Sequence, residues 1–362
     1  MSENTGQRFW VESIRTLAPY VPGEQPKVRD LVKLNTNENP FGPSPKVIEA
    51  INGAVNDSLR LYPDPDSSQL RQTIADTHNI KPDQVFVGNG SDEVLAFVFR
   101  AFFDSAKPLV FPDITYSFYP VYCGLYGLDS QLVPLTDDLS IDVQGLLAID
   151  PQSVSGLIFP NPNAPTGKLL SLEEIEQLAA HFCHTAVIID EAYIDFGGQS
   201  AVALIDRYPN VLVTQSLSKS RSLAGLRIGL AMGNAGLIEA LIRIKDSFNS
   251  YPLDRLAQAG AQAAIEDTAY FDACCARIIE MRTALTDALT NRGFEVVPSA
   301  ANFVLAQHAT HSAADLAAGL RANKVIVRHF DKPRISNYLR ITIGSAEQNQ
   351  ALLTALDAVM DA

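Results

Sequence analysis

The sequence predicts an α/β protein with a mostly parallel sheet and a smaller second lobe, and three observations support this. Short apolar runs that end in Gly, Pro, Asn or Asp alternate with longer segments of helical period. Several of these runs are apolar throughout, as strands covered on both faces are. The chain has 362 residues, of which 47% are hydrophobic, and this is enough for a large core divided between two lobes.

The first lobe is expected to alternate strands with helices. Its expected strands include residues 85–87, 109–111, 156–159, 186–190, 211–214 and 228–232. A helix is expected to begin after Ser171, because Ser171 and Glu174 form a capping-box pattern. It continues with apolar residues at helical spacing: Ile175, Leu178, Ala179 and Phe182. Helices therefore separate the strands.

The second lobe follows a strongly helical stretch that begins near Leu256 and runs through Leu289. Its expected strands are short and cover residues 294–297, 302–305, 324–328 and 338–343. At the other end of the chain, the Pro-rich stretch 19–45 predicts an extended arm rather than a packed element. We therefore divide the chain into an N-terminal arm (1–45), a large domain (46–255) and a small C-terminal domain (256–362).

Composition argues against several classes of protein. A net charge of −13 repels nucleic acid and anionic membranes, so neither is the expected partner. The N-terminus has no apolar core of signal-peptide length, and no later stretch is apolar for long enough to span a bilayer. The four cysteines lack paired spacing, so we expect a cytoplasmic location. His181, Cys183 and His184 have no second ligand pair nearby, so no metal is expected.

Lys219 is the residue that points most directly to chemistry. It lies in the segment 216–227, and Asp190 and Tyr193 come at the end of an upstream apolar strand. A lysine that forms a Schiff base with pyridoxal phosphate (PLP) needs a carboxylate for the ring nitrogen, a hydroxyl near the ring oxygen and donors for the phosphate. Asp190 and Tyr193 supply the first two, while Ser216, Ser218 and Arg227 supply the donors. The alternatives are a helix-capping Asp and a solvated Ser/Arg loop.

A glycine turn between an apolar strand and a helix is a candidate phosphate cradle. The segment 85–93 has this form, and its backbone N–H groups would face an anion at the helix N-terminus. A dinucleotide fingerprint is less consistent with the sequence, because Glu93 stands where the third glycine belongs. A purely structural turn remains an alternative.

The loop 161–168 resembles a nucleotide-binding loop only superficially. Pro162 occupies the first-glycine position, and Leu169 follows the lysine where Ser or Thr is required. A strand-exit loop that presents Asn side chains to a ligand fits better, with a plain turn as the alternative. Tyr116 is a candidate for stacking on a cofactor ring, although alone it would be assigned to the core.

Taken together, these motifs resemble those of the class I and II aminotransferases, and within them the histidinol-phosphate branch. The resemblance extends from Tyr20 to Gly344, and its motifs follow the order of the family. They are residues 35–45, 62–64, 90–93, 161–167, 190–193 and 219–227.

The resemblance implies a fold-type I PLP enzyme and a homodimer with active sites at the subunit interface. The large domain would hold a mostly parallel seven-stranded sheet and bind PLP, and the smaller α/β domain would include the N-terminal arm. Tyr62 would reach the cofactor phosphate of the neighbouring subunit. Ser91 and Asp92 match the phosphate cradle, Tyr116 matches the stacking ring, and the remaining cofactor contacts are Asp190, Tyr193, Ser216, Ser218, Lys219 and Arg227. Where the family usually has Asn before Pro-Thr-Gly, this chain has Ala164, so Asn161 or Asn163 would take over that contact.

The resemblance also implies a substrate. Arg328 and Arg340 match arginines that hold a substrate phosphate, and Tyr20 matches an arm residue that closes the site. Two cations suit a phosphate dianion better than a carboxylate. The implied reaction converts L-histidinol phosphate and 2-oxoglutarate to imidazole acetol phosphate and glutamate, a ping-pong step of histidine biosynthesis with Lys219 as carrier and base.

Four alternatives stay open at this stage. On the same fold, the chain could be an aromatic amino-acid aminotransferase or a threonine-phosphate decarboxylase-like enzyme. From other classes, it could be a nicotinamide dehydrogenase or a PLP-binding protein without catalytic activity.

Overall fold

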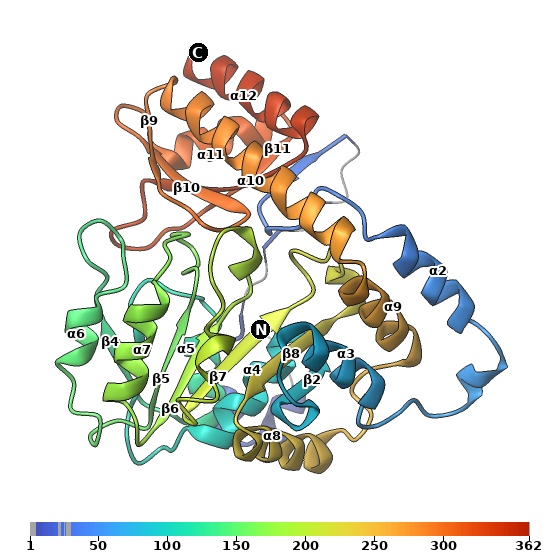
Figure 1. Cartoon of the computed structure of the whole chain (residues 1–362). Coiled ribbons are helices and arrows are strands. Elements are labelled where there is room, and N and C mark those ends of the chain that lie inside the picture. The colour runs from blue at the N-terminus through green and yellow to red at the C-terminus, as the bar shows by residue number, and fades with distance from the viewer. Residues whose placement is uncertain (1–4, 21–22, 25, 27–29, 362) are drawn as a thin grey trace.

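The computed structural model describes the chain except residues 1–4, 21–22, 25, 27–29 and 362. Two sheets lie one above the other in Figure 1, and the long helix α10 (Thr268–Thr290) runs from beside the smaller sheet toward the larger one. The larger sheet has seven strands in the order β2-β8-β7-β6-β5-β3-β4. Its strands are β2 (Val85–Asn89), β3 (Leu109–Pro112), β4 (Ser130–Val133), β5 (Gly156–Pro160), β6 (Ala186–Asp190), β7 (Val211–Ser216) and β8 (Ile228–Gly233).

The larger sheet is mostly parallel, as predicted, because only β8 runs against its neighbours β2 and β7. All other pairs along the sheet are parallel. Strands buried on both faces need apolar residues at every position, and β6 shows why. Ile188 packs into the core on one face, while Val187 and Ile189 pack into the core on the other.

Helices cover both faces of this sheet. One face packs against α4 (Gly90–Phe102), α5 (Tyr119–Tyr126) and α8 (Ala235–Phe248), and the other face against α2 (Pro45–Ala54), α3 (Ser68–His78), α6 (Val143–Leu147), α7 (Leu172–His181) and α9 (Arg255–Glu266). The predicted capping box is present at α7, where Ser171 Oγ accepts from the Glu174 N–H and Glu174 Oε2 accepts from the Ser171 N–H.

The smaller sheet has five strands in the order β1-β11-β12-β10-β9. Its strands are β1 (Val32–Leu34), β9 (Phe294–Val297), β10 (Phe303–His308), β11 (Val325–His329) and β12 (Tyr338–Thr342). It packs with α10, α11 (Ala313–Ala322) and α12 (Ala346–Met360) around a second core. The predicted α/β fold with a seven-stranded sheet and a smaller second unit is therefore confirmed.

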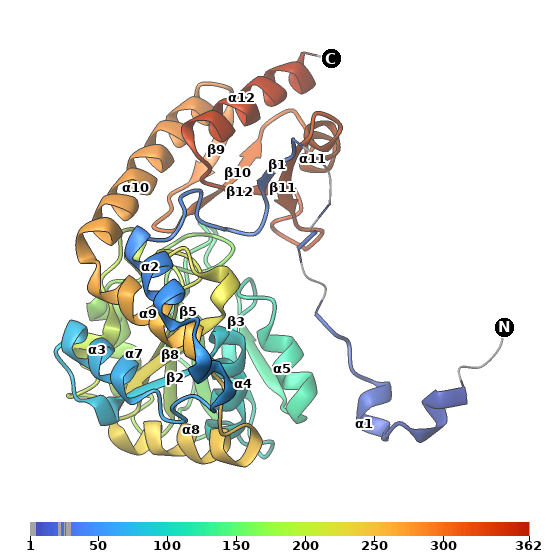
Figure 2. The same ribbon diagram turned by 90° about the vertical axis from the view of Figure 1, so that its right-hand side faces the viewer.

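Within its described residues, the N-terminal arm departs from its prediction at residues 32–34. Residues 32–34 form β1, which pairs in parallel with β11, and Leu34 is buried in the second core. The expectation of an arm without packed elements is wrong there, because a strand some distance away in the sequence supplies the pairing. Figure 2 shows the short helix α1 (Glu12–Arg15) lying apart from the main body of the fold.

The domain limits stay a prediction. Helix α9, which lies around the proposed boundary at 255/256, places Ala257 and Ala261 in the same core as Val47 of α2. Within the described residues, no helix combines the length and the apolar character needed to cross a membrane.

Candidate active site

Two adjoining cavities lie where several strands of the larger sheet end. The smaller cavity has a volume of about 200 Å³, and the larger one has a volume of about 400 Å³. Lys219, Tyr116 and Tyr193 line both. Other predicted residues also line the smaller cavity. They come from the ends of β6 and β7, the turn after β7, the residue before β8 and the start of α4, and they are Ser91, Asp92, Asp190, Ser216, Ser218 and Arg227. The carboxyl edge of a parallel sheet is the usual ligand position in α/β folds.

Lys219 lies in the turn that follows β7. Its Nζ donates to the carbonyl oxygen of Thr36 over 3.1 Å and lies 5.7 Å from the centre of the Tyr193 ring. Thr36 follows β1, so the amine contacts the chain segment that leaves the smaller sheet. An amine in this position is within reach of groups in both cavities.

Asp190 ends β6 and is buried. Its Oδ2 accepts from the Tyr119 hydroxyl at 3.1 Å, and its Oδ1 accepts from Thr214 Oγ1 at 3.4 Å. Burial raises the pKa of Asp190 to about 6 despite these hydrogen bonds. None of the ion pairs among the described residues includes Asp190. A protonated ring nitrogen in the cavity would give this carboxylate the cation that it lacks.

The start of α4 is shaped by two glycines. Gly90 has φ +82°, and a Cβ there would collide with the Arg227 guanidinium. A Cβ on Gly229 would collide with the backbone nitrogen of Ser91. Arg227 pairs with Asp92 at 2.9 Å, so a guanidinium, a helix N-terminus and the Ser91 side chain meet at one end of the smaller cavity. This donor set fits a phosphate group.

Tyr193 has the freedom to donate a hydrogen bond into the cavity. Its hydroxyl oxygen accepts from Asn37 Nδ2 at 3.0 Å, which leaves its own hydrogen available. Tyr116 donates to Asp92 Oδ1 at 3.1 Å, and its ring faces both cavities. The carboxylate, the phenol, the amine and the phosphate cradle that PLP requires are thus assembled in one place.

Asn161 and Asn163 are not among the residues that line the two cavities. Asn161 accepts from the Leu170 N–H and donates to the Leu170 carbonyl, while Asn163 donates to the Ile114 carbonyl and to Thr166. Both amides hold the loop between β5 and α7. Ala164, between them and Thr166, lines both cavities. Their predicted contact with a ring oxygen stays a prediction.

The larger cavity holds the three predicted substrate residues, Tyr20, Arg328 and Arg340. Arg328 and Arg340 are cross-strand partners on β11 and β12. Burial lowers the pKa of Arg340, whose guanidinium donates to the Asn35 carbonyl at 2.9 Å. Like charges directly opposite each other on a sheet are unfavourable unless an anion lies between them. The pair therefore indicates an anionic ligand.

Tyr62 lies away from the two cavities. It is 79% exposed and stacks on Tyr251 with ring centres 4.6 Å apart. Arg255 donates to its carbonyl oxygen at 3.2 Å, which holds the loop. Its side chain is available to another molecule rather than to the site of its own chain.

The sequence reasoning missed several residues that shape the cavities. Tyr119 and Thr214 contact Asp190, and their roles have no local signal because the partner comes from another strand. Thr36 and Lys332 line the larger cavity. The asparagine-rich segment around Thr36 was recognised as a motif, but nothing in the sequence connected it to Lys219.

These features together define a class of protein. The fold-type I PLP enzymes have this arrangement: a lysine after one strand, a buried acid at the end of the neighbouring strand, and a phosphate cradle, all on a seven-stranded sheet. A solved structure agrees: the histidinol-phosphate aminotransferase from Sinorhizobium meliloti, in complex with pyridoxal-5'-phosphate, superposes with a TM-score of 0.88. Its identity is 24% over 98% of both chains, so it supports the fold.

The family follows from the sequence comparison. The family model described as aminotransferase class I and II matches residues 29–356, and the chain belongs to that family. It is 60% identical to "Histidinol-phosphate aminotransferase 2" from Thiobacillus denitrificans, over 99% of this chain and 100% of that one. It is also 60% identical to "Histidinol-phosphate aminotransferase" from Pseudomonas putida strain W619, over 96% of this chain and 99% of that one.

Proposed function

We propose that this chain is a PLP-dependent aminotransferase that interconverts L-histidinol phosphate and imidazole acetol phosphate, with 2-oxoglutarate and glutamate as the second pair. The observation that carries the substrate is the pair Arg328 and Arg340, which face each other across β11 and β12 in the cavity beside Lys219. A phosphate dianion offsets two neighbouring positive charges better than a single carboxylate does. Relatives with 60% identity carry the same enzyme name.

Bound PLP supplies an electron sink for a carbanion next to the substrate nitrogen. Binding of the cofactor and transfer of the proton would fall to residues of this chain. Asp190 would pair with the ring nitrogen and favour its protonated form, and the Tyr193 hydroxyl would donate toward the ring oxygen. Ser91, Ser216, Ser218 and Arg227 hold the phosphate. Lys219 Nζ would carry the cofactor and, once released from it, would act as the base that takes the proton from the substrate carbon bearing the amine.

We also propose that the enzyme works as a homodimer in the cytoplasm. Tyr62 is exposed beside Tyr251, where it would reach the phosphate site of a second copy. The N-terminal segment around α1 also exposes large apolar side chains, Phe9, Trp10, Val11 and Ile14, which would be covered by a partner. Sedimentation of the purified protein would test the dimer, and Tyr62→Phe mixed with Lys219→Ala would test whether sites are shared.

The test of the reaction is a spectral titration of the purified, PLP-loaded protein. L-histidinol phosphate should convert the lysine-bound cofactor to its amine form at low concentration, and phenylalanine should do so far less well. The reverse preference would move the enzyme to the aromatic amino-acid branch and would overturn the role of Arg328 and Arg340. Release of CO2 from phosphothreonine would instead indicate a decarboxylase.

A further inference from the structure

The loop between β11 and β12, residues 330–337, crosses from the smaller sheet to the side of the larger one. Ile335 is buried in the core of the larger sheet, in the same cluster as Ile114 and Leu139. At the start of the loop, Phe330 packs against both arginines, with guanidinium carbons 5.6 Å and 5.5 Å from its ring centre. Both ends of the loop are therefore anchored at the cavity.

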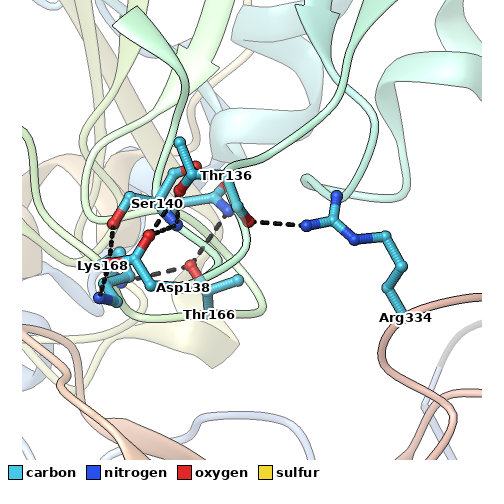
Figure 3. A network of polar contacts seen from close by, with 7 residues as sticks. Thr136, Asp138, Ser140, Thr166, Lys168 and Arg334 are labelled. Carbon is cyan, nitrogen blue, oxygen red and sulfur yellow. Dashed lines mark hydrogen bonds and ion pairs between the residues drawn. The ribbon is translucent and has the colours of Figure 1, made fainter.

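Arg334 provides a polar anchor beside Ile335. Its Nη2 donates to the carbonyl oxygen of Thr136 over 2.6 Å, and its Nη1 lies 3.5 Å from Asp113 Oδ2. The approach of Arg334 to Thr136 is visible in Figure 3. Arg334 has φ +67°, a conformation that a residue with a side chain keeps only when its surroundings hold it there.

The segment around Thr136, which Arg334 contacts, is linked by hydrogen bonds to the loop that lines the larger cavity. Asp138 accepts from Thr136 Oγ1 and from Lys168 Nζ, the latter over 2.8 Å, and these donors hold the pKa of its carboxyl well below the usual range. The Lys168 N–H donates to Thr166 Oγ1 in the same network (Figure 3). Thr166 follows Ala164 and Pro165, which line the larger cavity.

Lys332 lies between these anchors and lines the larger cavity together with Arg328 and Arg340. Among the described residues, none of the ion pairs uses the Lys332 ammonium. The backbone of Lys332 is thus held at the cavity while its charge stays uncommitted. The chain has a net charge of −13, so three cations gathered around one cavity make this region locally positive in an otherwise acidic protein.

We propose that Lys332 is a third cation that recognises the phosphate group of the substrate, and that Arg334 is the positioning residue that keeps it at the cavity. The inference rests on the proposed function, in which the substrate is a phosphate monoester. Such a group carries about −1.5 to −2 charges and three acceptor oxygens at neutral pH. Two arginines and one lysine match that charge, whereas a carboxylate substrate would need fewer donors.

The test compares L-histidinol phosphate with L-histidinol, which lacks the phosphate, in the same spectral titration. Lys332→Gln should raise the half-saturating concentration of L-histidinol phosphate roughly tenfold, as expected for one close charge pair at a solvent-exposed position. L-histidinol should be unaffected. Lys332→Arg should retain most of the affinity, and Lys107→Ala, at an exposed lysine away from the cavities, should behave as wild type. The effect of Lys332→Gln should shrink at about 0.5 M salt because exposed charges are screened.

Arg334→Gln tests the positioning role. It should weaken the binding of L-histidinol phosphate by a similar factor. The double variant with Lys332→Gln should bind this ligand no more weakly than either single variant, because both substitutions remove the same contact with the phosphate. Additive losses, or equal losses with L-histidinol, would overturn the inference. So would wild-type affinity for L-histidinol phosphate in Lys332→Gln. A wild-type protein that does not distinguish the two ligands would overturn the proposed function as well, so the two failures are separable.

Discussion

Tyr119 is the side chain that we expect to tune the acid of the site, because its hydroxyl donates to Asp190 Oδ2 over 3.1 Å. Tyr119→Phe removes that oxygen and keeps the buried ring, which packs edge-on against Phe111 and Tyr116. A hydrogen bond to a charged acceptor contributes roughly 1.5–3 kcal/mol, and one pKa unit corresponds to about 1.4 kcal/mol. The variant should therefore raise the pKa of Asp190 from about 6 by roughly one unit or more.

Cofactor affinity should report this change, because only the ionised Asp190 forms an ion pair with a protonated ring nitrogen. A shift of about one to two pKa units lowers the ionised fraction of Asp190 at pH 7 roughly two- to tenfold, so the dissociation constant of PLP for the apoprotein should rise by the same factor in Tyr119→Phe. The difference between variant and wild type should disappear as the pH rises past both pKa values. Titration of the apoprotein with PLP, followed by absorbance between about pH 5 and pH 9, measures both quantities.

The cofactor's own titration is common to both proteins, so it cancels in the comparison. Tyr126→Phe is the matched control, since Tyr126 lies on the same helix α5, whereas the side chains that hydrogen-bond to the Asp190 carboxylate within the described residues are Tyr119 and Thr214. Equal PLP affinities for Tyr119→Phe and wild type across the whole pH range would refute the reasoning. A lower melting temperature with unchanged affinity would likewise assign Tyr119 to packing alone.

Three further outcomes are expected. Lys219→Ala should reduce turnover by roughly 10³-fold or more while circular dichroism and the melting temperature stay close to wild type, since the half-buried amine makes one hydrogen bond to the fold. Gly90→Ala should cost roughly 1–3 kcal/mol of unfolding free energy and weaken PLP binding, because the residue has φ +82° and its Cβ would strike Arg227; denaturant melts and PLP titration check this. Burial raises the pKa of Glu191 from 4.5 to about 7, so the folded protein binds a proton there that the unfolded chain has released. Wild-type stability should therefore fall as pH rises from about 5 to 7. Glu191→Gln should flatten that fall in a pH series of denaturant melts, and an unchanged slope would argue against the assignment.

The strands could be predicted where burial on both faces makes a run continuously apolar, as in β3 and β5. Two strands were missed for a physical reason. Three of the four residues of β4 are exposed at the edge of the sheet, so no apolar run marks it. The three residues of β1 are fixed by pairing with β11, which lies far along the chain, and no local pattern encodes that partner.

The residues of the candidate site likewise fall into those that a local motif predicts and those that depend on distant parts of the chain. Lys219, Asp190 and the glycine turn before α4 were predictable, because each lies at or shortly after the end of a strand and carries its chemistry in a local motif. Tyr119 was not predictable as a partner of Asp190, since the two belong to different strand exits. Lys332 was missed because its role depends on a loop held by Arg334 and Ile335 against the other sheet.

The two sheets contribute different groups to the candidate site. The residues proposed to hold the cofactor, such as Asp190 and Ser91, lie at or just beyond the ends of strands of the larger sheet, whereas Arg328 and Arg340 lie on the smaller one. Charges that face the substrate phosphate can therefore change without altering the acid that faces the ring nitrogen. Lys332→Gln should leave PLP affinity unchanged, and Tyr119→Phe should leave the preference for L-histidinol phosphate over L-histidinol unchanged. Cross-effects in either direction would mean that the two cavities act as one recognition unit.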